Sequence, residues 1–93
     1  MKGILIEPGK APVVTTLPDT LQGIEAMLGC DCTQKVLPRT PAVLVYGLLG
    51  KGLNRIYRGQ NIYGTILCYG WKNNSLVPMS KDLQAEMLDR LKE

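Results

Sequence analysis

Apolar residues along this chain fall into short runs of strand length, interrupted by turn residues. Residues 4–6 form the first run, and residues 13–16 form a second run made of two valines and two threonines. Between them lies Glu7-Pro8-Gly9-Lys10, a typical type II turn, because proline presets the first turn residue and glycine accepts the positive φ of the second. Residues 3–16 are therefore predicted to form a hairpin, with a connection long enough for the two strands to separate in the sheet instead.

Helical spacing of apolar residues occurs in two places. In the first, Asp19 is predicted to cap the helix, Gln22 follows three residues later as in a capping box, and Gly29 suits the left-handed C-terminal position. The apolar residues that fall on one face of this helix are Leu21, Ile24 and Leu28. A second helix is predicted after Ser80, with apolar residues at every fourth position, namely Leu83, Met87 and Leu91.

The middle of the chain has the pattern of strands. Runs rich in β-branched and aromatic residues span 33–37, 42–46 and 64–69, and a short run follows at 76–77. The runs at 42–46 and 64–69 are almost entirely apolar, which is typical of central strands covered on both faces. Residues 47–63 contain four glycines and no clean period. This segment is predicted to be a long, mobile loop with one short strand at 55–57, and loops of this length are often functional.

These elements predict an α+β fold in a single domain spanning residues 1–93. We expect a mixed, mostly antiparallel sheet of about five strands with two helices packed on one face. A homodimer formed through the other face of the sheet would add the buried area that a small domain needs.

Composition removes several kinds of chemistry. The chain has 93 residues, is 45% hydrophobic and 20% charged, and contains no histidine, which excludes every catalytic triad and metal site that depends on imidazole. Three cysteines make a disulfide framework improbable, and Cys30 and Cys32 are too close in sequence for a zinc knuckle. We expect no metal, no cofactor, no signal peptide and no membrane span, and hence a cytoplasmic protein.

Charge is distributed unevenly along the chain. Between Asp31 and Asp82 there is no acidic residue, and seven basic residues fall in that interval: Lys35, Arg39, Lys51, Arg55, Arg58, Lys72 and Lys81. The net charge of the whole chain is only +3, because both ends carry an acidic excess. Part of this segregation follows from the depletion of acidic residues in strands. The basic charge nevertheless belongs to the β-rich middle.

Segment 50–63 combines cations, amides and aromatic rings. The candidate ligand-binding residues there are Lys51, Asn54, Arg55, Tyr57, Arg58, Asn61 and Tyr63. Such a set can bind phosphates and stack on bases, although a solvated surface or a protein-contact loop has a similar composition. The glycines match neither a P-loop nor a KH-type clamp. No carboxylate or thiol has a suitable partner for catalysis, so we expect no enzymatic activity.

Several short motifs resemble one protein family. They are the opening Met-Lys-Gly-Ile-Leu-Ile-Glu-Pro-Gly-Lys-Ala-Pro, the helix from Thr20 to Gly29, Asn54-Arg55, and Ile62-Tyr63-Gly64-Thr65. Together they resemble the DUF3846 family of small uncharacterised proteins from Firmicutes, their phages and plasmids. The resemblance implies a mobile-element context and no established activity. It highlights Asn54 and Arg55, for which the sequence offers no simple structural duty.

The sequence therefore leaves two functions open. The leading interpretation is a small non-catalytic binding protein, associated with a phage or another mobile element, that contacts an unknown protein or anionic ligand through the basic, glycine-rich loop 50–63. The alternative is a nucleic-acid- or nucleotide-phosphate-binding module that uses the acid-free interval 35–81. Salt separates them, because phosphate contacts weaken log-linearly with salt concentration and an apolar protein interface changes little.

Overall fold

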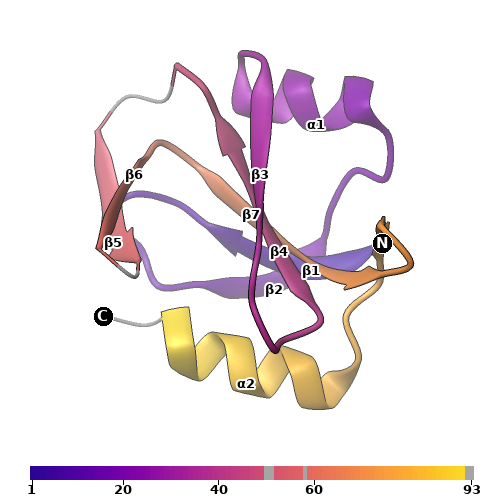
Figure 1. The fold of residues 1–93 in the computed structure, drawn as a ribbon. Coiled ribbons are helices and arrows are strands. Elements are labelled where there is room, and N and C mark those ends of the chain that lie inside the picture. Colours follow the sequence, from indigo (N-terminus) through magenta and orange to yellow (C-terminus); the bar gives the residue numbers. More distant parts are fainter. Residues whose placement is uncertain (50–51, 58, 92–93) are drawn as a thin grey trace.

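A six-stranded antiparallel sheet forms the centre of the computed structural model (Figure 1). The structure describes residues 1–49, 52–57 and 59–91, and of residues 55–57 the backbone only. The sheet has the order β2-β1-β7-β4-β3, with β8 beside β7. Its strands are β1 (Lys2–Ile6), β2 (Val13–Thr16), β3 (Cys32–Val36), β4 (Ala42–Gly47), β7 (Ile66–Lys72) and β8 (Ser75–Val77). The remaining elements are helices α1 (Leu21–Leu28) and α2 (Lys81–Leu91) and a separate hairpin of β5 (Leu53–Tyr57) and β6 (Gln60–Tyr63).

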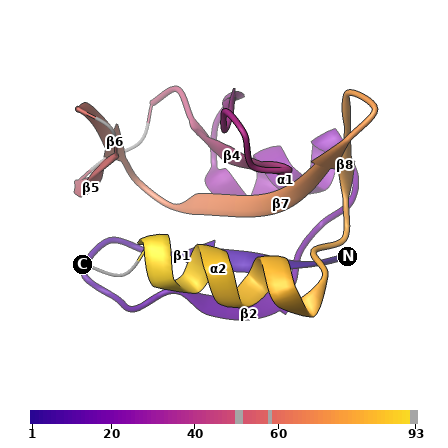
Figure 2. The same ribbon diagram turned by 60° about the horizontal axis from the view of Figure 1, so that its bottom comes forward.

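The two helices cover opposite faces of this sheet (Figure 2). Ile4 of β1 stands beside Cys68 of β7, which stands beside Leu44 of β4, and these side chains pack with Met87 and Leu91 of α2. The next residue of each strand points the other way. The opposite face accordingly buries Val43, Val45, Leu67 and Tyr69 with Ile24 of α1.

Two details of the predicted fold are therefore wrong. The helices do not share one face, because the almost wholly apolar strands β4 and β7 need cover on both sides. The sheet is not mixed either, since every strand pairing among the described residues is antiparallel. The α+β class, the strand number and the two helices are confirmed, and the radius of gyration of 11.9 Å is that of one compact unit.

Local signals in the sequence correctly predict most of the turns. Lys10 N donates to Glu7 O at 3.1 Å and Gly9 has φ 74°, which confirms the Pro-Gly turn between β1 and β2. Gly29 ends α1 with φ 78°. Ser80 Oγ accepts from Leu83 N at 3.2 Å and caps α2.

The predicted cap of α1 is wrong by one residue. The side chain of Thr20, and not that of Asp19, accepts from Gly23 N at 3.1 Å, and Thr20 has the extended backbone of an N-cap.

None of the helices in the described part of the chain is long and apolar enough to span a membrane.

Candidate functional site

Hairpin β5–β6 occupies most of the segment that the sequence pattern predicts to be a loop. β5 and β6 pair antiparallel with an irregularity between Leu53 and Arg55, and at the open end of the hairpin Gly64 N donates to Gly52 O at 2.9 Å. The predicted strand at 55–57 is confirmed and extends back to Leu53. The long-loop prediction is wrong because Asn61, Ile62 and Tyr63 alternate exposed, buried and exposed, which is the pattern of a strand with one face against a core.

Asn54 anchors this hairpin to the central sheet. Its side chain is only 6% exposed, and its Nδ2 donates to Ile6 O at 2.9 Å and to Gly64 O at 2.7 Å. These bonds tie β5 both to the end of β1 and to the residue that follows β6. Asn54 therefore has the structural duty that the sequence did not reveal, and its Nδ2 points into the fold and not toward a ligand.

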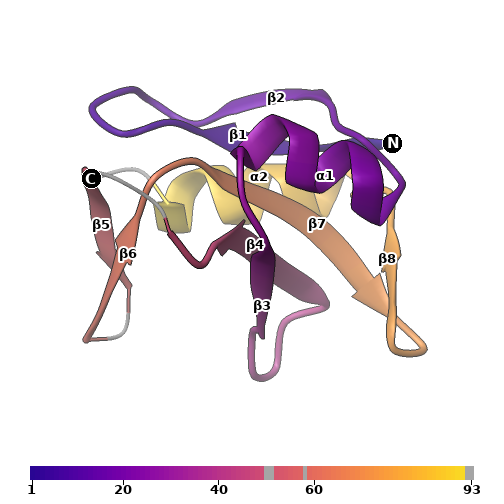
Figure 3. The same cartoon turned by 90° about the horizontal axis from the view of Figure 1, so that it is seen from above.

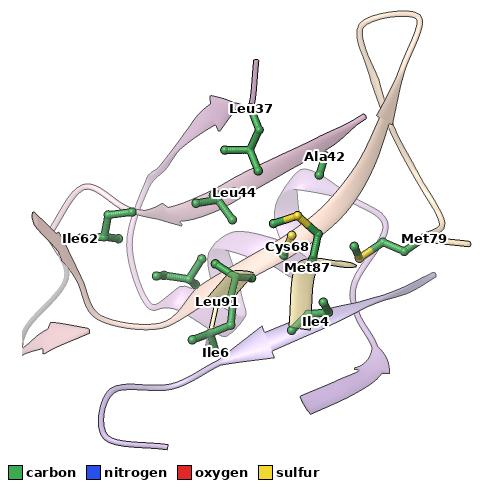
Figure 4. Packing of buried hydrophobic residues seen from close by; sticks show 11 residues of the cluster. Ile4, Ile6, Leu37, Ala42, Leu44, Ile62, Cys68, Met79, Met87 and Leu91 are labelled. Carbon is green, nitrogen blue, oxygen red and sulfur yellow. The ribbon is translucent and has the colours of Figure 1, made fainter. Parts of the chain in front are cut away.

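Ile62 is the second anchor. It is 1% exposed and belongs to the apolar cluster between the sheet and α2, which also contains Leu44 and Leu91 (Figure 4). Among the described side chains of the hairpin, the buried amide of Asn54 and the buried aliphatic chain of Ile62 thus both hold it on the core.

A third contact joins the hairpin to the edge of the sheet. Lys35 Nζ on β3 donates to Gln60 Oε1 at 2.7 Å, and Gln60 Nε2 donates to the hydroxyl of Tyr46 on β4 at 2.9 Å. Sequence reasoning did not single out Gln60 or Tyr46. No signal in the chain reveals this bridge, since its members are separated by up to 25 residues and meet only through the topology.

The side of β6 that faces away from the core carries Asn61 and Tyr63. Asn61 Nδ2 lies 3.5 Å from the hydroxyl of Tyr63, which is 46% exposed. Tyr63 stands opposite Leu53 in the hairpin, and Leu53 is 49% exposed. Leu48 and Leu49, which follow β4, are exposed by 62% and 77%. Exposed apolar side chains therefore gather along residues 48–63.

For the other candidate residues in this segment, the structure describes the backbone alone or nothing. The backbones of Arg55 and Tyr57 lie in β5, opposite Ile62 and Gln60. Lys51 and Arg58 lie outside the described residues. Among the seven candidates, Asn61 and Tyr63 are brought together on the outer surface and Asn54 is placed in the interior.

Those basic residues of the acid-free interval whose side chains the structure describes do not gather at one end of the sheet. Lys35 contacts the hairpin through Gln60. Arg39 lies in the turn between β3 and β4, and Lys72 lies at the end of β7 beside that turn, where Trp71 N donates to Pro41 O at 2.9 Å. The hairpin follows the opposite end of β4, so Arg39 and Lys72 stand away from it.

A cavity of about 450 Å³ adjoins the base of the hairpin. It opens between the C-terminal end of α1 and the two chain segments that connect the hairpin to β4 and β7, and it is lined by Leu28, Gly29, Cys30, Gly47, Leu49, Gly64 and Thr65. A second cavity of about 390 Å³ lies at the other end of the sheet, against Arg39, Thr40 and Arg90. Arg90 Nη1 donates to Thr40 Oγ1 there, and Arg90 Nη2 pairs with Glu86 at 3.0 Å.

Two of the three thiols, those of Cys32 and Cys68, are held in the protonated form. Burial raises the pKa of Cys68 from 9.0 to about 12. Burial, and secondly the negative charge of Glu25, raises the pKa of Cys32. Both thiols therefore stay protonated at neutral pH and are weak nucleophiles. Within residues 1–49, 52–57 and 59–91, no group of three or more cysteine or acidic side chains could hold a metal ion.

Comparison with known proteins gives one result. No curated protein and no solved structure matches the chain. A family model described as a domain of unknown function (DUF3846) matches residues 1–92, which is nearly the whole chain. The protein is therefore a member of the DUF3846 family, as its opening strand, first helix and hairpin motifs indicated.

Proposed function

We propose that this protein is a small non-catalytic binding protein that contacts its partner through segment 50–63 and the exposed leucines that precede it. The observation that carries the proposal is the exposure of four apolar side chains within residues 48–63, namely Leu48, Leu49, Leu53 and Tyr63, the last two of which stand opposite each other in the hairpin. Exposed apolar surface on a small domain is typical of a protein-contact site, and tyrosine is enriched at such sites.

The anchoring of the hairpin supports this proposal. Asn54 and Ile62 fix the hairpin on the core, and Gln60 fixes it on the sheet edge. Its outward side chains are therefore held on a backbone that is already in place, which lowers the entropy lost on binding. The protonated state of Cys32 and Cys68 agrees with a role without catalysis.

Site-specific photocrosslinking in the producing cell tests the proposal. A photoreactive residue at position 63 should capture a discrete partner, and the same residue at position 13, where Val13 is 51% exposed, is the matched control. A product formed from position 63 and lost in the Leu53→Ala variant supports the proposal. Equal products from positions 63 and 13, or none from position 63, contradict it.

The second candidate is a module that binds nucleic acid or nucleotide phosphate, using the hairpin together with Lys35. The contact from Lys35 Nζ to Gln60 favours it, because this contact brings a cation from β3 to a hairpin whose sequence is itself basic. Arg39 and Lys72 lie at the other end of the sheet, so the proposed interface is narrower than the interval 35–81.

An amide-shift titration with a short DNA duplex at low and moderate salt tests this second candidate. We expect shifts over residues 52–63 that weaken as salt rises, with a slope of about −0.9 per phosphate contact. Saturation by a mononucleotide would instead indicate a small phosphorylated ligand. The absence of shifts at both salt concentrations would eliminate binding to nucleic acid and leave the protein partner.

A mobile-element origin and a cytoplasmic location complete the proposal. The first rests on the family resemblance and is tested by the genes that neighbour its coding sequence. Fractionation of the producing cell tests the second.

A further inference from the structure

The path β2-β1-β7-β4-β3 through the central sheet ends in two edge strands, although both faces of the sheet are covered. Because α1 and α2 pack on opposite faces, a dimer through a bare face is not available to this fold. One edge is β2, which has four residues and is flanked by Pro12 and Pro18. The other is β3, which has five residues and no proline, and which Figure 3 shows at the margin of the fold. Prolines discourage further pairing at an edge, so β3 is the more accessible edge.

Two backbone hydrogen bonds establish which backbone groups of β3 point outward. Leu48 N donates to Asp31 O at 2.8 Å, and Leu37 N donates to Ala42 O at 3.0 Å. Both contacts follow the register of β3 with β4, in which hydrogen-bonded pairs alternate with non-bonded pairs. The odd-numbered residues from Asp31 to Leu37 therefore bond to β4. The backbone N–H and C=O groups of Cys32, Gln34 and Val36 point away from the sheet.

We propose that β3 pairs antiparallel with β3 of a second copy of this chain, across a twofold axis at Thr33. The outward groups allow only those registers in which even-numbered residues form the hydrogen-bonded pairs. With the axis at Thr33, Cys32 of one copy bonds with Gln34 of the other, and Thr33 faces its own counterpart.

Charge selects this register among the allowed ones. With the axis at Thr33, Lys35 of each copy stands opposite Asp31 of the other, and opposite charges across a pair of strands are stabilising. A shift of the axis to Lys35 would place the two lysines face to face, and like charges in that position are destabilising. An axis at Gln34 would place Lys35 opposite Thr33, where no opposite charge faces the lysine.

Lys35 does not block this edge. A lysine on an edge strand normally discourages pairing by projecting into the space of an incoming strand. Here Lys35 Nζ is held back over the face of the sheet by Gln60 Oε1 at 2.7 Å. Gln34 and Val36, by contrast, are exposed.

Mass measurement and cysteine crosslinking test the proposal together. We expect the wild-type chain to show a concentration-dependent dimer by light scattering. In a Cys30→Ser, Cys32→Ser background, Thr33→Cys should form an intermolecular disulfide on mild oxidation, because non-bonded antiparallel partners have Cα atoms about 4.5 Å apart and disulfides span about 4.4–6.8 Å. Gln34→Cys and Lys35→Cys should crosslink about tenfold more slowly, since they report the shifted registers.

Two further variants separate the proposal from a dimer of another kind. Gln34→Pro removes an outward N–H and leaves the β3–β4 bonds intact, so it should give a folded monomer. Lys35→Asp should weaken the dimer about tenfold, and adding Asp31→Lys should restore it by exchanging the two charges. A monomer at every concentration, or a dimer that survives Gln34→Pro, overturns the proposal. The hairpin crosslinking at position 63 does not depend on either result.

Discussion

The side-chain amide of Asn54 joins parts of the chain that are 48 residues apart in sequence. Its Nδ2 donates to the carbonyl at the end of β1 and to the carbonyl that follows β6, and Asn54 is only 6% exposed. A buried carbonyl that loses its donor costs more free energy than the hydrogen bond itself contributes.

Replacing Asn54 should therefore destabilise the protein although the residue lies in a surface hairpin. Asn54→Ala should lower the free energy of unfolding by about 1–3 kcal/mol, and Asn54→Asp by at least as much, because a carboxylate would face two carbonyl oxygens. Urea denaturation measures both. The exposed Asn61→Ala is the control and should stay within about 0.5 kcal/mol of wild type. A neutral Asn54→Ala would contradict the anchoring role.

Two buried ionisable groups in β7 predict sensitivity to alkali. Burial raises the pKa of Cys68 from 9.0 to about 12, and burial followed by the charges of Asp19 and Cys32 raises the pKa of Tyr69 from 10.0 to about 12. The Tyr69 hydroxyl also donates to Pro18 O at 2.6 Å. The folded protein thus retains protons that the unfolded chain releases above pH 9–10.

Stability should accordingly be retained below about pH 9 and lost progressively between pH 9 and 12. Each of the two groups contributes a slope of about 1.4 kcal/mol per pH unit between its unfolded and folded pKa values. Urea denaturation at a series of pH values measures this loss. Cys68→Ala should remove the part that begins near pH 9 and leave the part due to Tyr69. An unchanged pH profile in Cys68→Ala would contradict the assignment.

At the scale of elements, the hairpin and α1 show where sequence patterns are informative. Pro-Gly and Gly29 identify their turns because each requires a particular backbone angle. The sequence does not distinguish Asp19 from Thr20 as the cap of α1, because the two residues are adjacent and both are good N-caps. The path of the backbone at the start of the helix determines which side chain reaches Gly23 N. Of the hairpin, the sequence predicts only the strand at 55–57, because both strands are short and the contacts of Asn54 with Ile6 O and of Ile62 with the core are made with elements distant in sequence.

Alanine substitution at each position should show whether Thr20 or Asp19 caps α1. Thr20→Ala should lower stability by about 1 kcal/mol, because Gly23 N loses its acceptor. Asp19→Ala keeps that bond and should have a smaller effect. Thermal unfolding of both variants measures the difference, and a larger loss in Asp19→Ala would reverse the assignment.

The side chain of Ile62 should be needed to hold the hairpin against the core. Ile62→Ala removes a fully buried aliphatic side chain and should cost about 2–5 kcal/mol. Amide hydrogen exchange should accelerate over residues 52–63 before it changes in β7. Tyr63→Ala, on the outer side of the same strand, is the control and should leave the exchange of the hairpin nearly unchanged. Equal acceleration in both variants would contradict a hairpin held by Ile62.

For the whole molecule, the sequence predicts the composition of the sheet better than its layering. The α+β class, the strand count and the central position of β4 and β7 follow from apolar runs bounded by glycine and proline. The placement of α1 and α2 does not follow, because each helix has one apolar stripe that fits either face of a sheet that is apolar on both sides. The sequence also does not predict where the basic residues of the interval 35–81 lie. The strand order places Lys35 beside the hairpin and Arg39 and Lys72 at the other end of the sheet.

The topology also predicts slow folding. β1 pairs with β7, and Ile66 follows its partner Ile6 by 60 residues in the chain. Such non-local pairing places two-state folding in the millisecond-to-second range. Stopped-flow refolding should show one exponential phase on that scale, and a microsecond relaxation would contradict it.

The interior position of β1 has a consequence for synthesis on the ribosome. β1 and β2 leave the ribosome as a hairpin whose inner edge has no neighbour until β7 is made. At about 5–20 residues per second, the 60 residues from Glu7 to Ile66 take roughly 3–12 s to translate. Throughout that interval Ile4 and Ile6 belong to a nascent chain without its core. A chain halted after β4 should therefore require a chaperone to remain unaggregated, whereas the completed chain buries both residues.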